Sequence, residues 1–281
     1  MGRKEKMILI ILTIAVIAAA LAMAIKDKVD KPGGNIKISD CYSLSEFKFN
    51  GDFNAFYKDS YDWYKSIENE SGVYLVNTAY YNDDILTSWK ENEIYDSVPD
   101  KAFWYYTVSP SYLKQMNINI SNDIIHNAVS GTRLYLVPDT LSQNEIEQIS
   151  SYLKEDALKN AEKSTVETAF TDNQKIRIIS YTPNGSYFTF PSEKEEAVTD
   201  DAPIIYVCTC ANMTYFEYES LIATGVDSYI KFDNKDIMKS YSNKDELKQY
   251  HLKFKKLSSI YKTAAKADLV DKDIDKLFDE K

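Results

Sequence analysis

The run Ile204-Ile-Tyr-Val-Cys-Thr-Cys210 is apolar apart from a single threonine. Short runs of this kind, rich in β-branched and aromatic residues, are typical of buried strands. Because side chains alternate between the two faces of a strand, the thiols of Cys208 and Cys210 are expected on the same face. We therefore predict a strand here, with its cysteines packed as small apolar residues.

Similar stretches recur on both sides of this run, each bounded by Gly, Pro, Asn or Asp. They predict strands over Ile36 to Ser39, Val73 to Tyr80, Ala102 to Val108, Thr132 to Val137, Lys175 to Tyr181 and Asp227 to Phe232.

Amphipathic helices alternate with these strands. Between Asp52 and Asn69, apolar and aromatic residues recur every three or four positions, which predicts a helix that lies on the sheet. A second helix is expected from Leu141 to about Lys163, because Ser142 can cap it and Glu145 can close a capping box. A shorter helix is expected over Thr214 to Ala223, ended by Gly225. Interleaved strands and helices of varied length predict an α+β domain.

The C-terminal part has a different pattern. After a Ser242 cap, Leu247, Tyr250, Phe254, Leu257, Tyr261 and Ala264 keep a three-four spacing. This spacing predicts a helix over the segment 242–281. The helix either packs on its own domain or forms a stalk that contacts a partner.

The N-terminal segment Met7 to Ile25 contains nineteen residues with no charge, glycine or proline. As a helix of ~1.5 Å per residue it is long enough to cross most of a bilayer core. The basic residues Arg3, Lys4 and Lys6 favour a cytoplasmic N-terminus. We therefore expect a transmembrane anchor over residues 1–25. A cleaved signal peptide, with Ala22-Met-Ala24 as its cleavage site, is the alternative.

The residues that follow the anchor predict an exported, acidic domain. A turn-rich linker is expected over 26–35 and an extracytoplasmic domain over 36–241. The chain carries a net charge of −10, which disfavours nucleic acid as a partner. Three cysteines are too few for a disulfide framework, although a bridge from Cys41 to Cys208 or Cys210 stays open outside the cell.

The sequence contains no recognisable catalytic or metal-binding motif. Its two histidines, His126 and His251, lie in no metal-ligand spacing, and we expect both to be solvated or half-buried. No nucleophile elbow or phosphate-binding glycine loop is present. The run Asp271-Lys-Asp273-Ile-Asp275 resembles the start of a calcium loop but has Lys276 where the loop needs glycine. We predict no catalytic residue, no metal, no cofactor and no enzyme activity.

Adjacent acids and abundant tyrosine are the remaining features. The pairs Asp83-Asp84 and Asp200-Asp201 are expected in turns. Tyrosine numbers 22 and clusters around Tyr57 to Tyr64, Tyr74 to Tyr81, Trp104 to Tyr106 and Tyr215 to Tyr218. Such clusters serve either in a sheet or at a binding surface.

The order of segments resembles that of a known family. A first membrane helix is followed by Val76-Asn-Thr-Ala-Tyr-Tyr-Asn82, Val108-Ser-Pro-Ser-Tyr-Leu-Lys114, Thr132-Arg-Leu-Tyr-Leu-Val-Pro138, Thr171-Asp-Asn-Gln-Lys175 and Thr199-Asp-Asp-Ala-Pro-Ile-Ile-Tyr-Val207. In these features the chain resembles the bacteriocin-associated integral membrane proteins of Gram-positive bacteria, which are similar to permease subunits of ABC transporters. The family places further membrane helices after its outer domain, where this chain stops at Lys281. A single-pass relative and a piece of a longer permease are both consistent with this difference.

The resemblance implies a non-enzymatic outer domain that works beside a transporter ATPase in peptide export or immunity. We expect a single-pass protein of the cell membrane, with its main domain outside the cell. The expected partners are a membrane protein complex such as the ATPase and permease subunits of an ABC transporter, a peptide ligand, and the lipid bilayer through residues 7–25. The alternative is a secreted or surface-attached protein that binds glycans or peptides, or a hydrolase, using tyrosine-rich surfaces.

Overall fold

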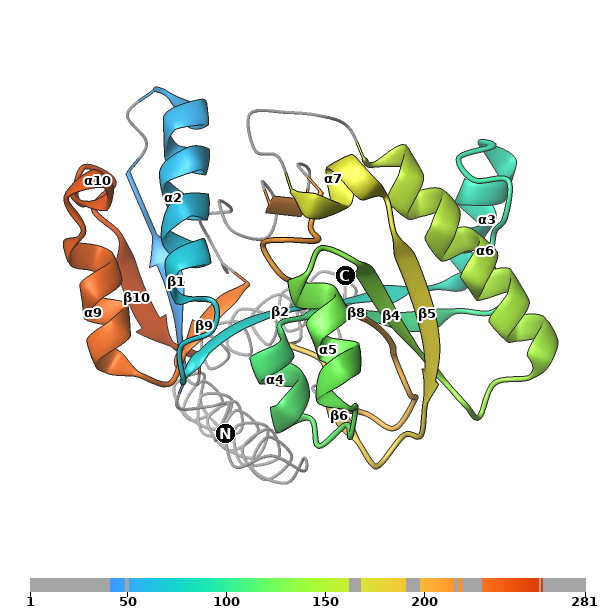
Figure 1. Cartoon of the computed structure of the whole chain (residues 1–281). Helices are drawn as coiled ribbons and strands as arrows, with labels where there is room; N and C mark the ends of the chain where they lie inside the picture. The colour runs from blue at the N-terminus through green and yellow to red at the C-terminus, as the bar shows by residue number, and fades with distance from the viewer. Residues whose placement is uncertain are drawn as a thin grey trace, which may run out of the picture.

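A computed structural model describes residues 41–48, 51–161, 168–190, 198–214, 217–218, 229–257 and 259. Within them, eight strands form one sheet, with β10 at one end and β5 at the other (Figure 1). In spatial order the strands are β10 (Lys253–Lys256), β1 (Tyr42–Glu46), β9 (Ile230–Phe232), β2 (Val73–Tyr81), β3 (Phe103–Val108), β8 (Ile204–Val207), β4 (Arg133–Pro138) and β5 (Ile176–Tyr181). A separate antiparallel pair joins β6 (Tyr187–Phe188) to β7 (Val198–Thr199).

The large sheet is mixed. The pairs β3–β8 and β4–β5 are parallel, and the other neighbouring pairs are antiparallel. Parallel pairs need a crossover connection, and helices supply much of the chain between them. The mixed sheet with interleaved helices confirms the predicted α+β class.

The two longest helices in the described residues follow the sequence signals closely. Helix α2 (Phe53–Ile67) begins after Asp52, whose carboxylate accepts the backbone N–H of Ala55. Helix α6 (Gln143–Lys159) begins with the predicted capping box, in which Ser142 and Glu145 satisfy each other's backbone N–H groups. Both predicted helices are confirmed, although α6 ends a few residues before Lys163.

Hydrophobic residues fill both faces of the sheet. On one face, buried side chains of α2 and α6 pack against alternate strand residues such as Leu75, Tyr135 and Tyr206. On the other face, α4 (Pro110–Gln115) and α5 (Asn122–Val129) cover the intervening residues, such as Val76 and Leu136. The strict alternation explains why β2, β4 and β8 are apolar on both sides.

Several short helices were not predicted from the sequence. They are α3 (Asp83–Glu91), α4, α5, α7 (Ala169–Asn173) and α9 (Lys235–Asn243), whereas α10 (Asp245–Lys248) lies within the segment 242–281, for which a helix was predicted. The turn expected at Asp83-Asp84 is wrong, because these acids occupy the first turn of α3 after an Asn82 cap. Carboxylates are favourable there, since they face the positive end of the helix dipole.

The predicted strands over 73–80, 102–108, 132–137 and 175–181 are confirmed within one or two residues. The strand from Ile204 is shorter than expected and ends at Val207. Cys208 and Cys210 nevertheless lie in the same core cluster, as the alternation predicted. The strand expected over 227–232 is described from Ile230 onward.

The continuous helix expected over the segment 242–281 is wrong over its first part. Helix α10 ends at Lys248, His251 adopts a positive φ of 48°, and β10 follows. Leu247, Tyr250 and Phe254 do bury apolar surface, but they do so from a helix, a turn and a strand. Because β10 pairs with β1, this part of the segment 242–281 belongs to the same sheet as the segment 36–241.

The three cysteines are buried, and none of them is joined in a disulfide. Cys41 precedes β1 and Cys208 follows β8, and three strands lie between β1 and β8. At ~4.8 Å per strand spacing the separation is roughly 19 Å, whereas a disulfide needs Cα atoms about 4.4–6.8 Å apart. The bridge left open by the sequence is therefore excluded.

Several expectations fall outside the described residues. They are the anchor over 1–25, the linker over 26–35, the strand at Ile36 to Ser39, most of the helix over Thr214 to Ala223, and the acidic run from Asp271. Among the described helices, none has the length and apolar character that a membrane crossing requires.

Candidate functional site

The cysteines and histidines do not form a catalytic group together. Cys208 and Cys210 are each 1% exposed, and burial raises the pKa of both thiols well above its ordinary value. A thiol held in its protonated form is a weak nucleophile. His126 and His251 lie apart on exposed positions of α5 and of the turn after α10. In the described part of the chain, no three His, Cys, Asp or Glu side chains could hold a metal ion together.

A connected polar cluster lies inside the molecule. Arg133 is 1% exposed, and its guanidinium makes a bidentate pair with Glu217 and donates to the Tyr135 hydroxyl. Its Cζ lies 4.1 Å from the centroid of the Tyr206 ring. Burial acts to lower the pKa of Arg133, but the charge of Glu217 keeps that pKa well above its ordinary value. Arg133 is therefore a permanent buried cation.

This cluster ties β4 and β8 to the chain that follows β8. The Tyr206 hydroxyl donates to the Asn212 side chain at 2.9 Å, and Asn212 donates to the backbone of Thr132 and Val207. Glu217 also accepts the Thr214 backbone N–H at 2.8 Å. Every polar atom named here has a protein partner. The cluster therefore stabilises the fold and is not arranged to receive a ligand.

Most of the tyrosines also serve the fold. Tyr61, Tyr64, Tyr74 and Tyr106 are buried in the two core clusters. Tyr80 is the most exposed of the tyrosines that line β2, at 37%. The sequence clusters thus largely reflect sheet and helix packing.

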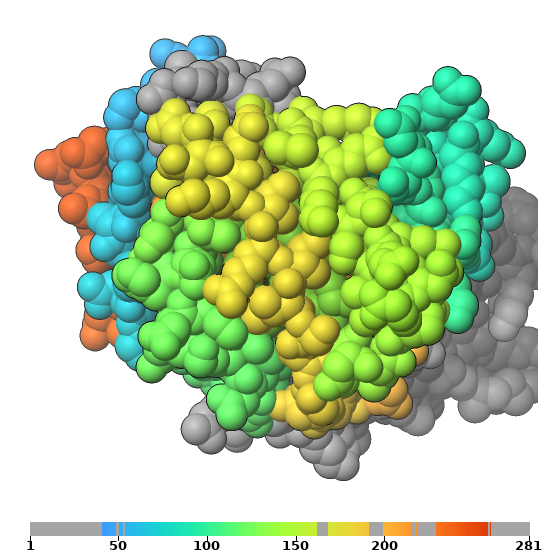
Figure 2. All heavy atoms as spheres, turned by 45° about the vertical axis from the view of Figure 1, so that its right-hand side comes forward, coloured from blue at the N-terminus to red at the C-terminus, as the bar shows by residue number. Residues whose placement is uncertain are grey.

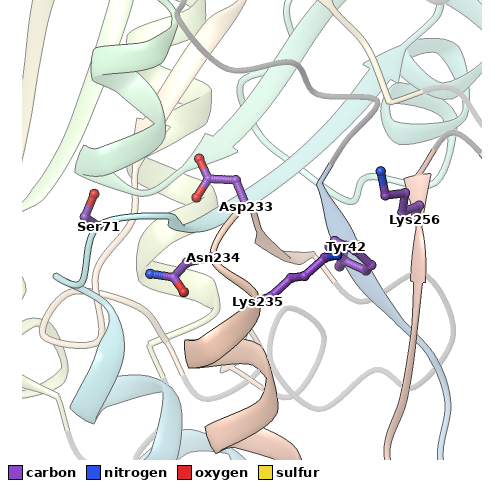
Figure 3. Close-up of a pocket in the computed structure, with 6 residues that line it drawn as sticks. All are labelled: Tyr42, Ser71, Asp233, Asn234, Lys235 and Lys256. Carbon is purple, nitrogen blue, oxygen red and sulfur yellow. The ribbon is translucent and has the colours of Figure 1, made fainter.

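A polar hollow of about 620 Å³ lies where α9 begins (Figure 3). Lys235 and Lys256 each place a charged nitrogen within 6 Å of the Tyr42 ring centroid. The Asp233 carboxylate accepts a hydrogen bond from the Tyr74 hydroxyl at 2.9 Å, and the Asn234 side chain caps the N-terminus of α9. These polar groups are engaged with one another, so the hollow selects no particular ligand.

The end of the sheet at β5 offers a different kind of site. The backbone N–H of Arg133 donates to the backbone carbonyl of Lys175 at 2.8 Å, and the backbone N–H of Asp139 donates to that of Tyr181 at 2.9 Å. In a parallel ladder with this register, the odd-numbered residues of β5 direct their backbone N–H and C=O groups toward β4. The even-numbered residues Ile176, Ile178 and Ser180 direct theirs away from the sheet.

No other strand in the described part of the chain pairs with this side of β5. Figure 2 shows the strand running exposed across the surface, between the green atoms of α5 and the yellow-green atoms of α6. A row of outward backbone groups can pair with another extended chain. The edge of β5 is therefore a template for strand addition.

A groove accompanies this edge. It has a volume of about 430 Å³ and is lined by Ile146, Ser150 and Lys154 of α6 and by Ile176, Arg177 and Ile178 of β5. Isoleucine supplies the apolar wall, and Lys154 and Arg177 supply positive charge. An added strand would place alternate side chains against this groove.

The opposite end of the sheet is built differently. Strand β10 carries three lysines in four residues, and Lys253 and Lys255 pair with Glu46. Lysine-rich edge strands resist pairing with other chains. Strand β5 carries three isoleucines in its six residues, and all three line the groove. Of the two ends, β5 is the one suited to docking, and we define the outward backbone of β5 with its groove as the β5 edge.

The chain matches no protein-family model, no curated protein and no solved structure. The strand over 175–181 was predicted from the sequence, but no site residue was expected in it. The pattern Ile176-Arg-Ile-Ile was visible. What it could not reveal was the strand order, which alone makes β5 an edge.

Proposed function

We propose that this protein is a non-enzymatic interaction domain, held at the outer face of a cell membrane, that binds an extended segment of a partner protein at the β5 edge. The observation that carries the proposal is the outward row of backbone groups at Ile176, Ile178 and Ser180, beside a groove that combines isoleucine side chains with positive charge. Backbone pairing supplies affinity in this mode of recognition, and pockets for alternate side chains supply selectivity.

The membrane location rests on the sequence. Met7 to Ile25 has the length and composition of a membrane-spanning helix. The resemblance to bacteriocin-associated membrane proteins makes a transporter complex the expected partner. A reporter fused after Lys281 should be reached by protease added to intact cells. Protection of that reporter in intact cells would contradict the outer location.

The interaction is tested by recovering partners from detergent-solubilised membranes with the full chain. The informative variant is Ile178→Pro, because proline removes an outward N–H and leaves the bonds to β4 in place. Asp83→Pro is the matched control, since it puts proline at the first position of α3, where helices tolerate it.

We expect the unmodified chain and Asp83→Pro to recover the same partner, and Ile178→Pro to lose it. Urea unfolding of all three proteins verifies that the substitutions leave the fold intact. Equal recovery by a folded Ile178→Pro variant would overturn strand addition at β5.

A further inference from the structure

We infer that the segment bound at the β5 edge is acidic and amphipathic, with apolar side chains facing α6 and a carboxylate beside Arg177. This inference rests on the proposed function, because it names the class of chain that the same edge accepts.

The two faces of β5 differ in what they present to a neighbouring strand. Ile176 and Ile178 pack toward the core cluster that contains α6, whereas Ile179 lies toward the cluster that contains α5. Alternation puts Arg177 on the same face as Ile179. An added strand therefore meets an apolar wall on one face and a guanidinium on the other.

The groove beside β5 is large enough to accept side chains of an added strand. At about 430 Å³, the groove lies within the range of ~300–1,000 Å³ that is common for ligand sites. Side chains spaced two residues apart on an added strand would enter it beside Ile146 and Ile178. Apolar residues at alternate positions of the partner satisfy this requirement.

The charge at the edge is positive although the whole chain is acidic. Lys154 and Arg177 are exposed and are the charged residues of the groove. Neither forms an ion pair with another side chain in the described ranges. Lys175 is exposed just before the strand. Although the chain has a net charge of −10, Lys154, Arg177 and Lys175 make the β5 edge positive. This positive charge favours a partner that carries carboxylates.

The same charges disfavour a second copy of this chain at the edge. Two antiparallel β5 strands centred on Ile178 would place the two Arg177 residues at diagonal positions, roughly 7–8 Å apart. Like charges at that distance repel each other. A partner of opposite charge removes this penalty and gains cross-strand ion pairs.

The test uses the full chain in mild detergent and three capped synthetic peptides. Each peptide alternates valine with a second residue, which is glutamate, glutamine or lysine. Fluorescence anisotropy measures the affinity of each labelled peptide. Arg177→Gln is the informative variant, and Lys239→Gln is its charge-matched control on α9, far along the sheet from β5.

We expect the glutamate peptide to bind about fivefold tighter than the glutamine peptide, as an exposed ion pair allows, and the lysine peptide to bind weakest. The glutamate preference should shrink as salt rises. Arg177→Gln should reduce it while leaving the glutamine peptide unchanged, and Lys239→Gln should have no effect.

Equal binding of the glutamate and glutamine peptides, both abolished by Ile178→Pro, would overturn the acidic partner and leave strand addition standing. An unchanged glutamate preference in Arg177→Gln would overturn the role of Arg177. Binding of no peptide, or binding that Ile178→Pro leaves intact, would overturn the proposed function itself. Concentration-dependent dimerisation lost in Ile178→Pro would identify a second copy as the occupant and contradict the inference.

Discussion

Replacing Arg133 by methionine tests how the interior of the sheet is held together. In the native protein the guanidinium satisfies both carboxylate oxygens of Glu217 and lies against the Tyr206 ring. Methionine fills a similar volume among the aromatic rings but leaves Glu217 without its counter-charge. Loss of one partner of a buried ion pair costs about 3–5 kcal/mol.

The structure places the expected cost of Arg133→Met near the lower end of that range. The side chain of Glu217 is 21% exposed and retains the Thr214 N–H, so water and backbone can solvate part of its charge. We expect a loss of about 3 kcal/mol. Glu217→Gln should cost at least as much, because it strands Arg133, which is 1% exposed and cannot lose its proton.

The assay is urea unfolding of the full chain in mild detergent, followed by the fluorescence of the buried tryptophans Trp63 and Trp104. The free energy of unfolding should fall by about 3 kcal/mol per molar urea, so each single substitution should lower the urea midpoint by about 1 M. The double variant Arg133→Met/Glu217→Gln should be no less stable than either single variant, because no uncompensated charge remains. Single losses below about 1 kcal/mol, or a double loss equal to the sum, would refute this explanation.

Three further predictions concern the fold. Gly131→Ala should destabilise the protein by about 2 kcal/mol in urea unfolding, because Gly131 has φ +90° and an added Cβ would lie 2.1 Å from the Cβ of Ala169; a neutral effect would contradict the close approach. The three cysteines should resist a thiol reagent until urea unfolds the chain, since all are buried, and fast labelling of the folded protein would argue against that burial. Burial raises the pKa of the Glu68 carboxyl, against a hydrogen bond from the Cys210 N–H that lowers it. The favourable contribution of Glu68 to stability is therefore complete below about pH 4 and is lost as pH rises through the folded pKa. Glu68→Gln should therefore gain stability relative to the native chain between about pH 4 and 7. A stability advantage of the variant that grows toward acid pH would contradict this prediction.

The sequence predicted most of the regular structure because local signals agreed with tertiary packing. Apolar residues recur every three or four positions along α2, and the pair Ser142 and Glu145 marks the start of α6, so both helices were predictable. The strands flanking the central run were visible because β-branched and aromatic residues fill them on both faces.

The C-terminal prediction failed for a physical reason. Leu247, Tyr250, Phe254 and Leu257 have a helical spacing, and Leu247, Tyr250 and Phe254 lie against the core that the spacing implied. Pairing of β10 with β1 gives the backbone of Phe254 an extended conformation instead. The spacing of apolar residues predicted which side chains are buried here. It did not distinguish a continuous helix from a helix, a turn and a strand.

The candidate site lay beyond local reasoning. The isoleucines of β5 read as an ordinary core strand. Strand β4 pairs with β8 on one side and with β5 on the other. In the described sheet no further strand pairs with β5, so β5 forms an edge. Strand order depends on contacts between residues far apart in the chain, and these leave no mark on a single strand.

Amide hydrogen exchange at β5, with and without the glutamate peptide, tests strand addition most directly. In the free chain the amides of Ile176, Ile178 and Ser180 should exchange quickly, and those of Arg177 and Ile179, bonded to β4, should exchange slowly. Addition of the peptide should slow the first three and leave the other two unchanged. Protection of all five amides in the free chain, or no change on peptide binding, would contradict an open edge at β5.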